Sequence, residues 1–227
     1  MPEIKPAVLE ALVSMIVHDL RNPTATLGAN ISFVREVLDD ESVPRDEIDD
    51  ALADAQQALY DLMRGLDQVS WIGRWCNERS PAGVAVEGLR ATFERVRARV
   101  RYGELTIEQP EAGLKVRGGD ALERLLDLLI ANGHQHAPRT VVKLSAARTG
   151  DTVVVEVVDE GRPLAPELAQ LAFTLEGQTA VKGRSEGRYG RVAGLFSASI
   201  LAQALGATLD AVERDGHNVF RVVLPLS

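Results

Sequence analysis

The sequence is poor in cysteine and has no long apolar run. Cys76 is the only cysteine among 227 residues, so no disulfide within the chain and no cysteine metal cluster can form. A chain of this kind suits the reducing cytoplasm. No apolar run approaches the roughly 18 to 20 residues of a membrane-spanning helix. The apolar stretch near the N-terminus contains Glu10 and follows no basic leader, so we do not expect a signal peptide. These absences predict a cytoplasmic protein without a membrane partner.

An excess of positive charge is also absent, because the formal net charge is -8. Residues 1–79 hold 7 Lys and Arg against 15 Asp and Glu, whereas the remaining residues hold 18 of each kind. The acidic part therefore coincides with the first third of the chain. A negative surface repels a phosphate backbone, so we expect no nucleic-acid partner, and a solvated acidic helix face accounts for the charge.

Two amphipathic helices are predicted in residues 1–79. Apolar residues recur at steps of three, four or seven between Leu9 and Leu38, which is typical of one helix face. The polar segment DDESVPRDE interrupts the pattern. A second run with steps of four and three extends from Ile48 to Val69, as in a heptad seam. Two such helices form an antiparallel hairpin whose apolar stripe is only half covered, so we expect two chains to pair as a four-helix bundle in a homodimer.

A second domain is predicted over residues 80–227, after the linker-like stretch NERSPAG. Strand patterns such as TVVVEVVD alternate with apolar helix patterns such as LERLLDLLIANGHQH. The segments TGD and DG between strand patterns predict hairpin turns. The sequence therefore predicts an α+β sandwich, a mixed sheet with helices on one face.

The stretch VHDLRNPTAT places a histidine and a proline inside the first predicted helix. His18 lies two residues from both Ile16 and Leu20, so it points away from the apolar stripe. Asn22 lies one turn below His18 on the same face. An exposed imidazole is a nucleophile near neutral pH, and Asp19 beside it could orient the ring or move a proton. On spacing alone, an ordinary surface histidine is the simpler interpretation.

The six residues from His18 to Pro23, HDLRNP, resemble the H-box of two-component sensor histidine kinases. The resemblance implies that His18 is the phosphoacceptor on a dimeric four-helix bundle and that Asp19 assists phosphoryl transfer as an acid or base. It also implies that Asn22 positions water or the phosphoryl group. Arg21 and Pro23 complete the motif, and in this family the proline bends the helix.

Residues from about 84 to 227 are similar to the ATP-binding domain of the same kinases, the Bergerat or GHKL ATPase fold. The segment LLDLLIANGHQHAP resembles the N-box, which makes Asn132 the expected magnesium ligand. The family usually has a second Asn where this chain has Leu128, and an apolar side chain cannot bind a metal. The resemblance thus implies an N-box that is altered at one of its two Asn positions.

Two further boxes are recognisable and altered. Asp159, where the family accepts a hydrogen bond from the adenine amino group, and Gly161 match the G1 box, but its last glycine is Pro163. Gly190 and Gly194 match the G2 box, but its middle glycine is Val192, and a β-branched residue crowds a backbone that must approach phosphates. Arg191 belongs to a basic, glycine-rich lid that could contact a triphosphate; a solvated loop is an equal alternative.

Three functions remain open at this point. In the first, His18 exchanges a phosphoryl group with an Asp of a response-regulator receiver domain, and the ATP reaction is weakened or lost, as in dimeric histidine phosphotransferases. In the second, the chain is an active histidine kinase that uses ATP and Mg²⁺ to phosphorylate His18. In the third, it is a pseudokinase that sequesters a regulator. The intact H-box favours a phosphotransfer enzyme over the third.

Overall fold

The computed structural model describes residues 6–40, 42–77, 86–100, 103–136, 140–161, 164, 169, 171–174 and 193–227. The chain divides into two compact units, residues 1–74 and 75–227. The predicted boundary between residues 79 and 80 falls within residues 78–85, outside the described residues. Among the described helices, none combines the length and apolar character required to cross a bilayer.

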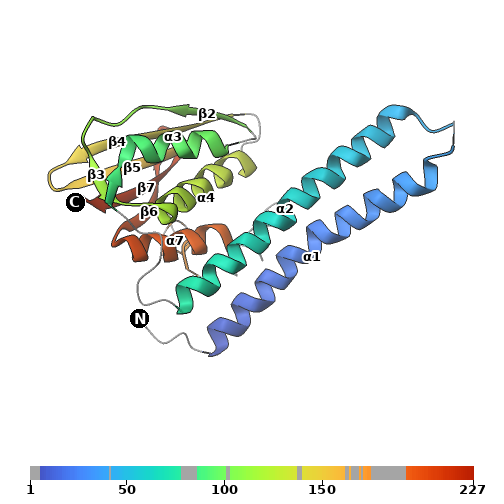
Figure 1. Cartoon of the computed structure of the whole chain (residues 1–227), viewed down its shortest axis with the longest axis horizontal. Coiled ribbons are helices and arrows are strands. Elements are labelled where there is room, and N and C mark those ends of the chain that lie inside the picture. The colour runs from blue at the N-terminus through green and yellow to red at the C-terminus, as the bar shows by residue number, and fades with distance from the viewer. Residues whose placement is uncertain are drawn as a thin grey trace. The chain divides into compact units, whose positions relative to one another are not determined.

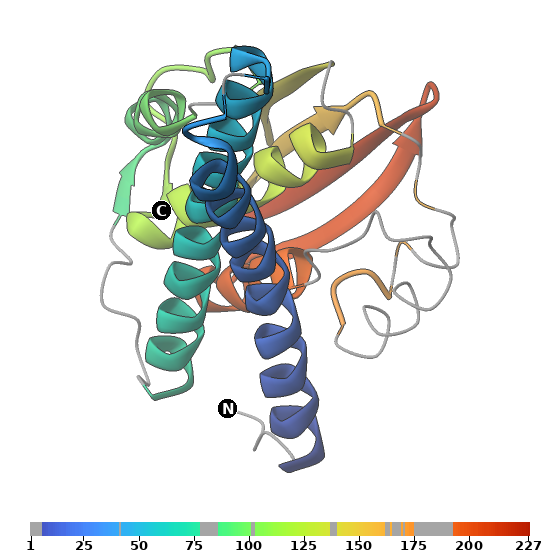
Figure 2. The same cartoon turned by 90° about the vertical axis from the view of Figure 1, so that its right-hand side faces the viewer.

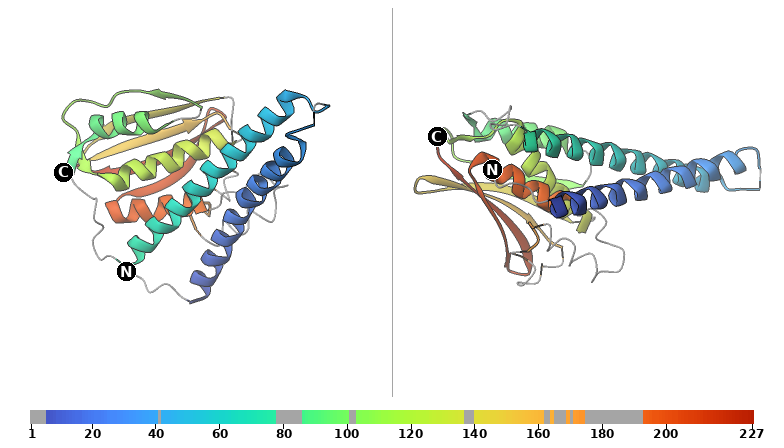
Figure 3. Two further views of the ribbon diagram at one scale, coloured as in Figure 1. Left: turned by 45° about the vertical axis from the view of Figure 1, so that its right-hand side comes forward. Right: turned by 90° about the horizontal axis from the view of Figure 1, so that it is seen from below.

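The first unit is a helical hairpin. Helix α1 spans Pro6–Val37 and helix α2 spans Arg45–Asn77, and the two run antiparallel side by side (Figures 1 and 3). At the connection, Asp40 Oδ1 accepts hydrogen bonds from the Ser42 hydroxyl at 2.6 Å and from the Ser42 N–H at 2.9 Å. These bonds lower the pKa of Asp40. These contacts lie in the polar segment that separates the two apolar runs in the sequence.

One stripe of α2 is buried and consists mainly of small residues. Ile48, Ala51, Ala55 and Ala58 are buried at alternating steps of three and four. Gly65 continues the same series, and a Cβ on Gly65 would lie 2.7 Å from Cδ2 of Leu20. The Leu20 side chain therefore occupies the space left by Gly65, which brings the two helices close together at the HDLRNP motif.

A second stripe of α2 consists of large apolar side chains that the single chain leaves exposed. Leu52, Leu59 and Leu66, spaced by seven residues, are 48%, 43% and 52% exposed. On α1, Val17 and Ile31 are 49% and 53% exposed. The predicted seam from Ile48 to Val69 therefore contains buried residues, Ile48 and Ala55, as well as the three exposed leucines.

The second unit contains helices on one side of a sheet (Figure 2). Its described helices and strands are β1 (Val86–Gly88), α3 (Leu89–Arg99), β2 (Glu104–Ile107), β3 (Lys115–Arg117), α4 (Asp120–His136), β4 (Val141–Thr149), β5 (Thr152–Asp159), α7 (Ala193–Leu205), β6 (Thr208–Arg214) and β7 (His217–Pro225). The main sheet has the order β2-β4-β5-β7-β6, and β1 pairs with β3 separately. Because β2 and β4 are parallel and the other pairs are antiparallel, the predicted mixed sheet with helices on one face is confirmed.

The core lies between α4 and the sheet. The leucines of α4 are buried, and β5 alternates buried valines with more exposed residues, as expected for a strand with one face covered. The Asp-Gly turn between β6 and β7 has positive φ at Asp215 (55°) and Gly216 (80°), the conformation of a two-residue hairpin turn. In the neighbouring pair of strands, Asp159 of β5 faces Asn218 at the start of β7.

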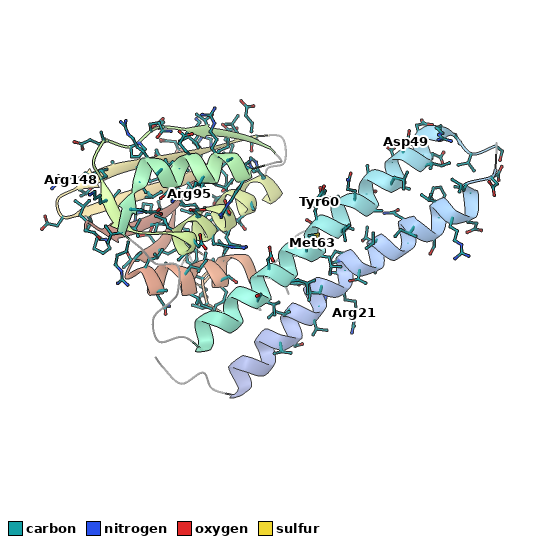
Figure 4. All side chains as sticks on the ribbon, viewed as in Figure 1. Arg21, Asp49, Tyr60, Met63, Arg95 and Arg148 are labelled. Atoms are coloured by element: carbon teal, nitrogen blue, oxygen red, sulfur yellow. The ribbon has the colours of Figure 1, made fainter. Side chains whose placement is uncertain are left out.

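A network of charges ties β1 to α3 and α4. The carboxylate of Glu87 accepts hydrogen bonds from the Gly119 N–H at 2.6 Å and the Thr92 hydroxyl at 2.8 Å, and it also pairs with Arg95. Arg95, labelled on α3 in Figure 4, also binds Glu123 of α4. Glu123 is 2% exposed and forms a second ion pair with Arg99 at 2.7 Å. The network anchors the first turn of the helix that later carries Asn132.

Candidate functional site

His18 lies on the exposed side of α1. Its side chain is 59% exposed, and its Nδ1 is 3.2 Å from Oδ1 of Asp19, whose side chain is only 14% exposed. An ionised carboxylate only accepts hydrogen bonds, so this contact selects the tautomer with hydrogen on Nδ1 and the lone pair on Nε2. The expected outward orientation of His18 is confirmed, and the geometry leaves Nε2 as the nucleophilic atom.

Pro23 does not end the helix. Helix α1 continues through Pro23 to Val37, although Pro23 cannot donate the usual hydrogen bond to the residue four positions back. Next to it, the Thr24 hydroxyl donates to the carbonyl of Leu20 at 2.7 Å. Side-chain bonds of this type weaken the local helical ladder slightly. The backbone just below His18 is thus held partly by a side chain.

The remaining H-box residues lie at the surface. Arg21 and Asn22 are exposed, and Arg21 projects from α1 on the side opposite to Tyr60 of α2 (Figure 4). Besides Arg21, the described exposed residues along the His18 side of α1 include Ser14, Asn22, Ala25 and Ala29, whose side chains are short. Small side chains leave a macromolecular partner room to approach the imidazole.

Asp159 lies at the end of β5, and only one of the two oxygens of its buried carboxylate accepts hydrogen bonds from the described residues. The residue is 1% exposed. Its Oδ1 accepts from the Gly161 N–H at 2.8 Å and from Nδ2 of Asn218 at 3.1 Å. Its Oδ2 is buried and has no hydrogen-bond donor among the described residues. Burying an acceptor without a donor costs about 1–3 kcal/mol, so the site is suited to a ligand that supplies an N–H group.

Asn218 is a site residue that our sequence analysis missed. It is 6% exposed on β7, donates to Asp159, and accepts the N–H of Leu164 at 2.8 Å. The signal was present in the sequence, because Asn218 precedes Phe220, Val222 and Leu224 at steps of two. A polar residue at the head of an inward-facing series is a candidate for a buried hydrogen-bonding role.

The N-box residues lie in the last turns of α4. Asn132 is half-buried, while Leu128 is 8% exposed and belongs to the core. No group of three or more His, Cys, Asp or Glu able to hold a metal ion occurs in the described parts of the chain. A magnesium site at Asn132 would therefore need further ligands from elsewhere, such as phosphate oxygens and water.

His134 is a partly buried imidazole near the end of α4. Both its ring nitrogens are buried without a hydrogen-bond partner among the described residues, and Gly103 lies against the ring. Burial lowers the pKa of His134 below 6.5, although the Asp159 carboxylate opposes the shift. The unfolded state then binds a proton more readily than the folded state.

We therefore expect the free energy of unfolding to decrease as pH falls below about 6.5. The contribution of neutral His134 to the free energy of unfolding is fully present above this pH. It is lost as the pH falls toward the pKa of His134 in the folded state, which is the lower of the two. Urea unfolding of the native chain and of His134→Leu at pH 8 and pH 5.5 measures it. The variant should lose less stability between the two pH values, and an equal loss in both proteins would contradict the prediction.

Other predicted site residues are described only in part. Gly161 is buried next to Asp159, and Gly194 lies in the first turn of α7 with open space where a Cβ would lie. Gly190 and Arg191 lie outside the described residues, as do Pro163, Val192 and the rest of the predicted lid. The described residues thus bring Asp159, Gly161 and Asn218 together in one hydrogen-bonded cluster.

Comparisons with known proteins agree with this fold. Residues 118–227 match the family described as histidine kinase-, DNA gyrase B-, and HSP90-like ATPase. The sensor protein KdpD of Mycobacterium tuberculosis strain CDC 1551 is 28% identical over 229 residues, which cover 94% of this chain and 25% of that protein. The chain thus spans about a quarter of the length of the curated relatives it matches.

Two solved structures have the same fold over most of the chain. The Acinetobacter baumannii histidine kinase AdeS gives a TM-score of 0.62 at 16% identity, covering 92% of this chain and 98% of that one. Histidine kinase ThkA, solved in complex with response regulator protein TrrA, gives a TM-score of 0.66 at 19% identity, covering 97% of this chain and 63% of that one. Both the hairpin and the second unit therefore have counterparts in these proteins.

Proposed function

Since the chain is a two-component histidine kinase catalytic core whose second unit is a GHKL ATPase-like domain, we propose that His18 carries a phosphoryl group and exchanges it with an Asp of a response-regulator receiver domain. The observation that carries this proposal is the exposed imidazole of His18 with its Nδ1 held by Asp19. The ThkA structure, solved with a response regulator, supports a partner of this kind. A location in the cytoplasm is part of the proposal.

The geometry suits transfer from an aspartyl phosphate. Nε2 of His18 attacks the phosphorus, a P–N bond forms, the P–O bond to the receiver Asp breaks, and that Asp leaves as a carboxylate. The resulting phosphoimidazole retains the hydrogen on Nδ1 and gains positive charge, which Asp19 stabilises at 3.2 Å. In the reverse direction the same carboxylate holds the ring in place. Asn22, one turn below, is placed to orient the phosphoryl group or water, while Arg21 and Pro23 shape the surrounding surface.

We further propose a homodimer through the exposed large stripe of the hairpin. Leu52, Leu59 and Leu66 on α2, with Val17 and Ile31 on α1, are exposed apolar side chains, and the three leucines follow coiled-coil spacing. Pairing two hairpins would bury these side chains in a four-helix bundle. His18 belongs neither to the buried stripe nor to the exposed apolar stripe, so we expect its imidazole to remain accessible in the proposed dimer.

Leu59→Glu is expected to convert the dimer into a monomer, because it places a charge inside the proposed interface, where an unpaired charge is costly. Sedimentation equilibrium at micromolar concentration measures the change. Ala53→Glu adds the same charge to an exposed position of α2 and should leave the mass unchanged. A native chain that sediments as a monomer, or a Leu59→Glu chain that remains dimeric, would contradict the proposal.

A second candidate, ATP-dependent phosphorylation of His18, is favoured by Asp159. The buried Oδ2 without a donor among the described residues suits the amino group of adenine, and members of the matched family bind ATP with Mg²⁺. Asn132 would contribute one oxygen ligand to the metal, and Gly161 and Gly194 would border the nucleotide, together with Gly190 and Arg191 of the lid. The nucleotide would supply the phosphoryl group, and this chain would hold the base and present His18.

The two candidates differ in the donor, so the test supplies each donor separately to the native chain. One sample receives radiolabelled ATP with Mg²⁺, and the other receives a receiver domain phosphorylated on Asp. Label that is stable in base and labile in acid identifies phosphohistidine, and mass spectrometry assigns it to His18. Label from the receiver alone supports the phosphotransferase, and label from ATP supports the kinase. If neither donor labels His18, the phosphotransfer proposal fails and the non-catalytic pseudokinase takes its place.

A further inference from the structure

We propose that Gly65 of α2 is a positioning residue for phosphoryl transfer. By leaving room for Leu20, it holds the turn of α1 that carries His18 at the distance from α2 that a docked receiver domain requires. This inference rests on the phosphotransfer proposed above. It adds a residue of the second helix, outside the HDLRNP motif, that acts on His18 through Leu20 and does not itself touch the phosphoryl group.

The side chain of Leu20 fills the space that a side chain on Gly65 would need. A Cβ on Gly65 would lie 2.7 Å from Cδ2 of Leu20, well inside the roughly 3.5–4.0 Å at which carbon atoms pack. Both residues are half-buried, and Leu20 lies in the middle of the HDLRNP motif. Even an alanine at position 65 would therefore displace Leu20 or push this turn of α1 away from α2.

The hairpin has more room one heptad away. Moving seven residues along each helix from Leu20 and Gly65, coiled-coil spacing places Leu27 opposite Ala58. Leu27 is half-buried and Ala58 is buried, so the chain accommodates a Cβ on α2 at that level. The level that carries His18 is narrower by one carbon atom on the α2 side.

The turn that carries His18 depends on this contact because its own helical hydrogen bonds are weakened. Pro23 has no N–H, so the usual helical bond to the Asp19 carbonyl cannot form. The Leu20 carbonyl accepts the Thr24 hydroxyl at 2.7 Å, and side-chain bonds of this type often bend helices. A turn with a weakened backbone ladder is easier to displace, so the packing of Leu20 against α2 is what fixes its position.

Displacing Leu20 also displaces the reactive groups. Asp19, which directly precedes Leu20, holds Nδ1 of His18 at 3.2 Å, and its side chain is largely buried while the imidazole projects outward. A shift of the turn therefore moves Nε2 relative to a receiver domain docked on the hairpin. In-line attack tolerates little misplacement, since an error of about 1 Å can slow a reaction about 10²-fold. A small donor that diffuses freely can follow the imidazole and escapes this constraint.

The test compares Gly65→Ala with Gly28→Ala. Both replace a glycine inside a helix, which by itself favours the helix, but a Cβ on Gly28 would lie in open space. With a saturating amount of a receiver domain phosphorylated on Asp, Gly65→Ala should transfer the phosphoryl group to His18 about tenfold more slowly than the native chain. The receiver concentration that gives half the maximal rate should change by less than about twofold. Gly28→Ala should transfer at the native rate.

Phosphoramidate is the matched small donor. Nε2 of His18 attacks its phosphorus, a new P–N bond forms, the P–N bond of the donor breaks, and ammonia leaves. Because this donor needs no docking surface, the native chain, Gly65→Ala and Gly28→Ala should be labelled on His18 at rates within about twofold of one another. The double variant Leu20→Val with Gly65→Ala moves one carbon atom from α1 to α2 and preserves the packed volume, so it should recover most of the transfer rate from the receiver.

The outcomes separate the possible failures. Equal slowing of Gly65→Ala with both donors, together with a lower urea midpoint, would mean that Gly65 merely stabilises the fold and would overturn the inference. A native transfer rate from the receiver in Gly65→Ala, or a double variant as slow as Gly65→Ala, would overturn it as well, while the proposed phosphotransfer would stand. If phosphoramidate labels the native chain and the phosphorylated receiver does not, exchange with the receiver fails and this inference fails with it.

Discussion

Replacing His18 with glutamine is expected to abolish all phosphohistidine, whichever donor is supplied. Glutamine is similar in polarity and length, but the lone pair of its amide nitrogen is delocalised into the carbonyl group and cannot attack phosphorus. Because His18 is 59% exposed and its ring contacts the adjacent Asp19, the substitution should disturb the helix little, within about 0.5 kcal/mol. The loss of label therefore reports chemistry rather than unfolding.

Asp19→Asn provides the graded comparison. The amide at position 19 can still hydrogen-bond the ring, but it cannot neutralise a positively charged phosphoimidazole. We expect phosphoryl transfer to slow by about 10² to 10⁴, the usual contribution of an acid–base partner, and not to vanish. Rapid-quench measurement of the transfer rate distinguishes Asp19→Asn, which should be slow, from His18→Gln, which should be inactive. Circular dichroism is the control for folding. Residual label on His18→Gln at another histidine would contradict the assignment of the phosphoacceptor.

The second large effect is expected at Glu123, which is 2% exposed and pairs with Arg95 and Arg99. The hydrogen bond to Glu123 is the main cause of the raised pKa of Arg95. Removing one member of a fully buried ion pair costs about 3–5 kcal/mol. Since the Arg95 side chain is 42% exposed, water can partly replace the lost carboxylate, so we expect Glu123→Ala to cost about 2–3 kcal/mol.

The measurement is thermal unfolding, in which this loss corresponds to a fall in Tm of roughly 5–10 °C for a chain of this size. The matched control is Arg214→Ala. Arg214 forms a bidentate pair with Glu156, at 3.1 and 2.7 Å, but its side chain is 53% exposed. Its removal should cost no more than about 1 kcal/mol. Equal effects at the two sites would contradict the view that burial, rather than pairing, determines the cost.

The fold could be anticipated from the sequence where one local pattern dominates. The period of β5 and the Asp215-Gly216 turn specify a strand and a hairpin without reference to the rest of the chain, and both are present. The short strand β1 was not predicted, since three residues carry no periodicity and Val86–Gly88 is a strand only through its pairing with β3. The stripes of α2 were merged for a related reason, because spacing alone does not say which of two adjacent faces meets α1.

The candidate site was predictable to a different extent in each unit. The His18 motif is contiguous, so its residues could be read from one stretch, and the structure places them on one helix. The cluster around Asp159 combines residues up to 59 positions apart, as in the bond from Asn218, and no local pattern reports such a distance. The close approach of α4 to β5 at Gly133, where a Cβ would lie 3.0 Å from Cβ of Asp159, also gives no signal in the sequence and is visible only in the structure.

In the proposed dimer, the alanine and glycine stripe of α2 makes the stability of the hairpin, and so the availability of His18, depend on the concentration of the chain. Alanines bury little apolar area, so a single hairpin gains little stability from its own contact. The large apolar side chains of α2 are the outward leucines, which a second copy would cover in the proposed dimer. If the proposed dimer forms, folding of the first unit follows the law of mass action, as in obligate dimers. The abundance of the protein in the cell, and not only its signal, would determine what fraction of its histidines can be phosphorylated.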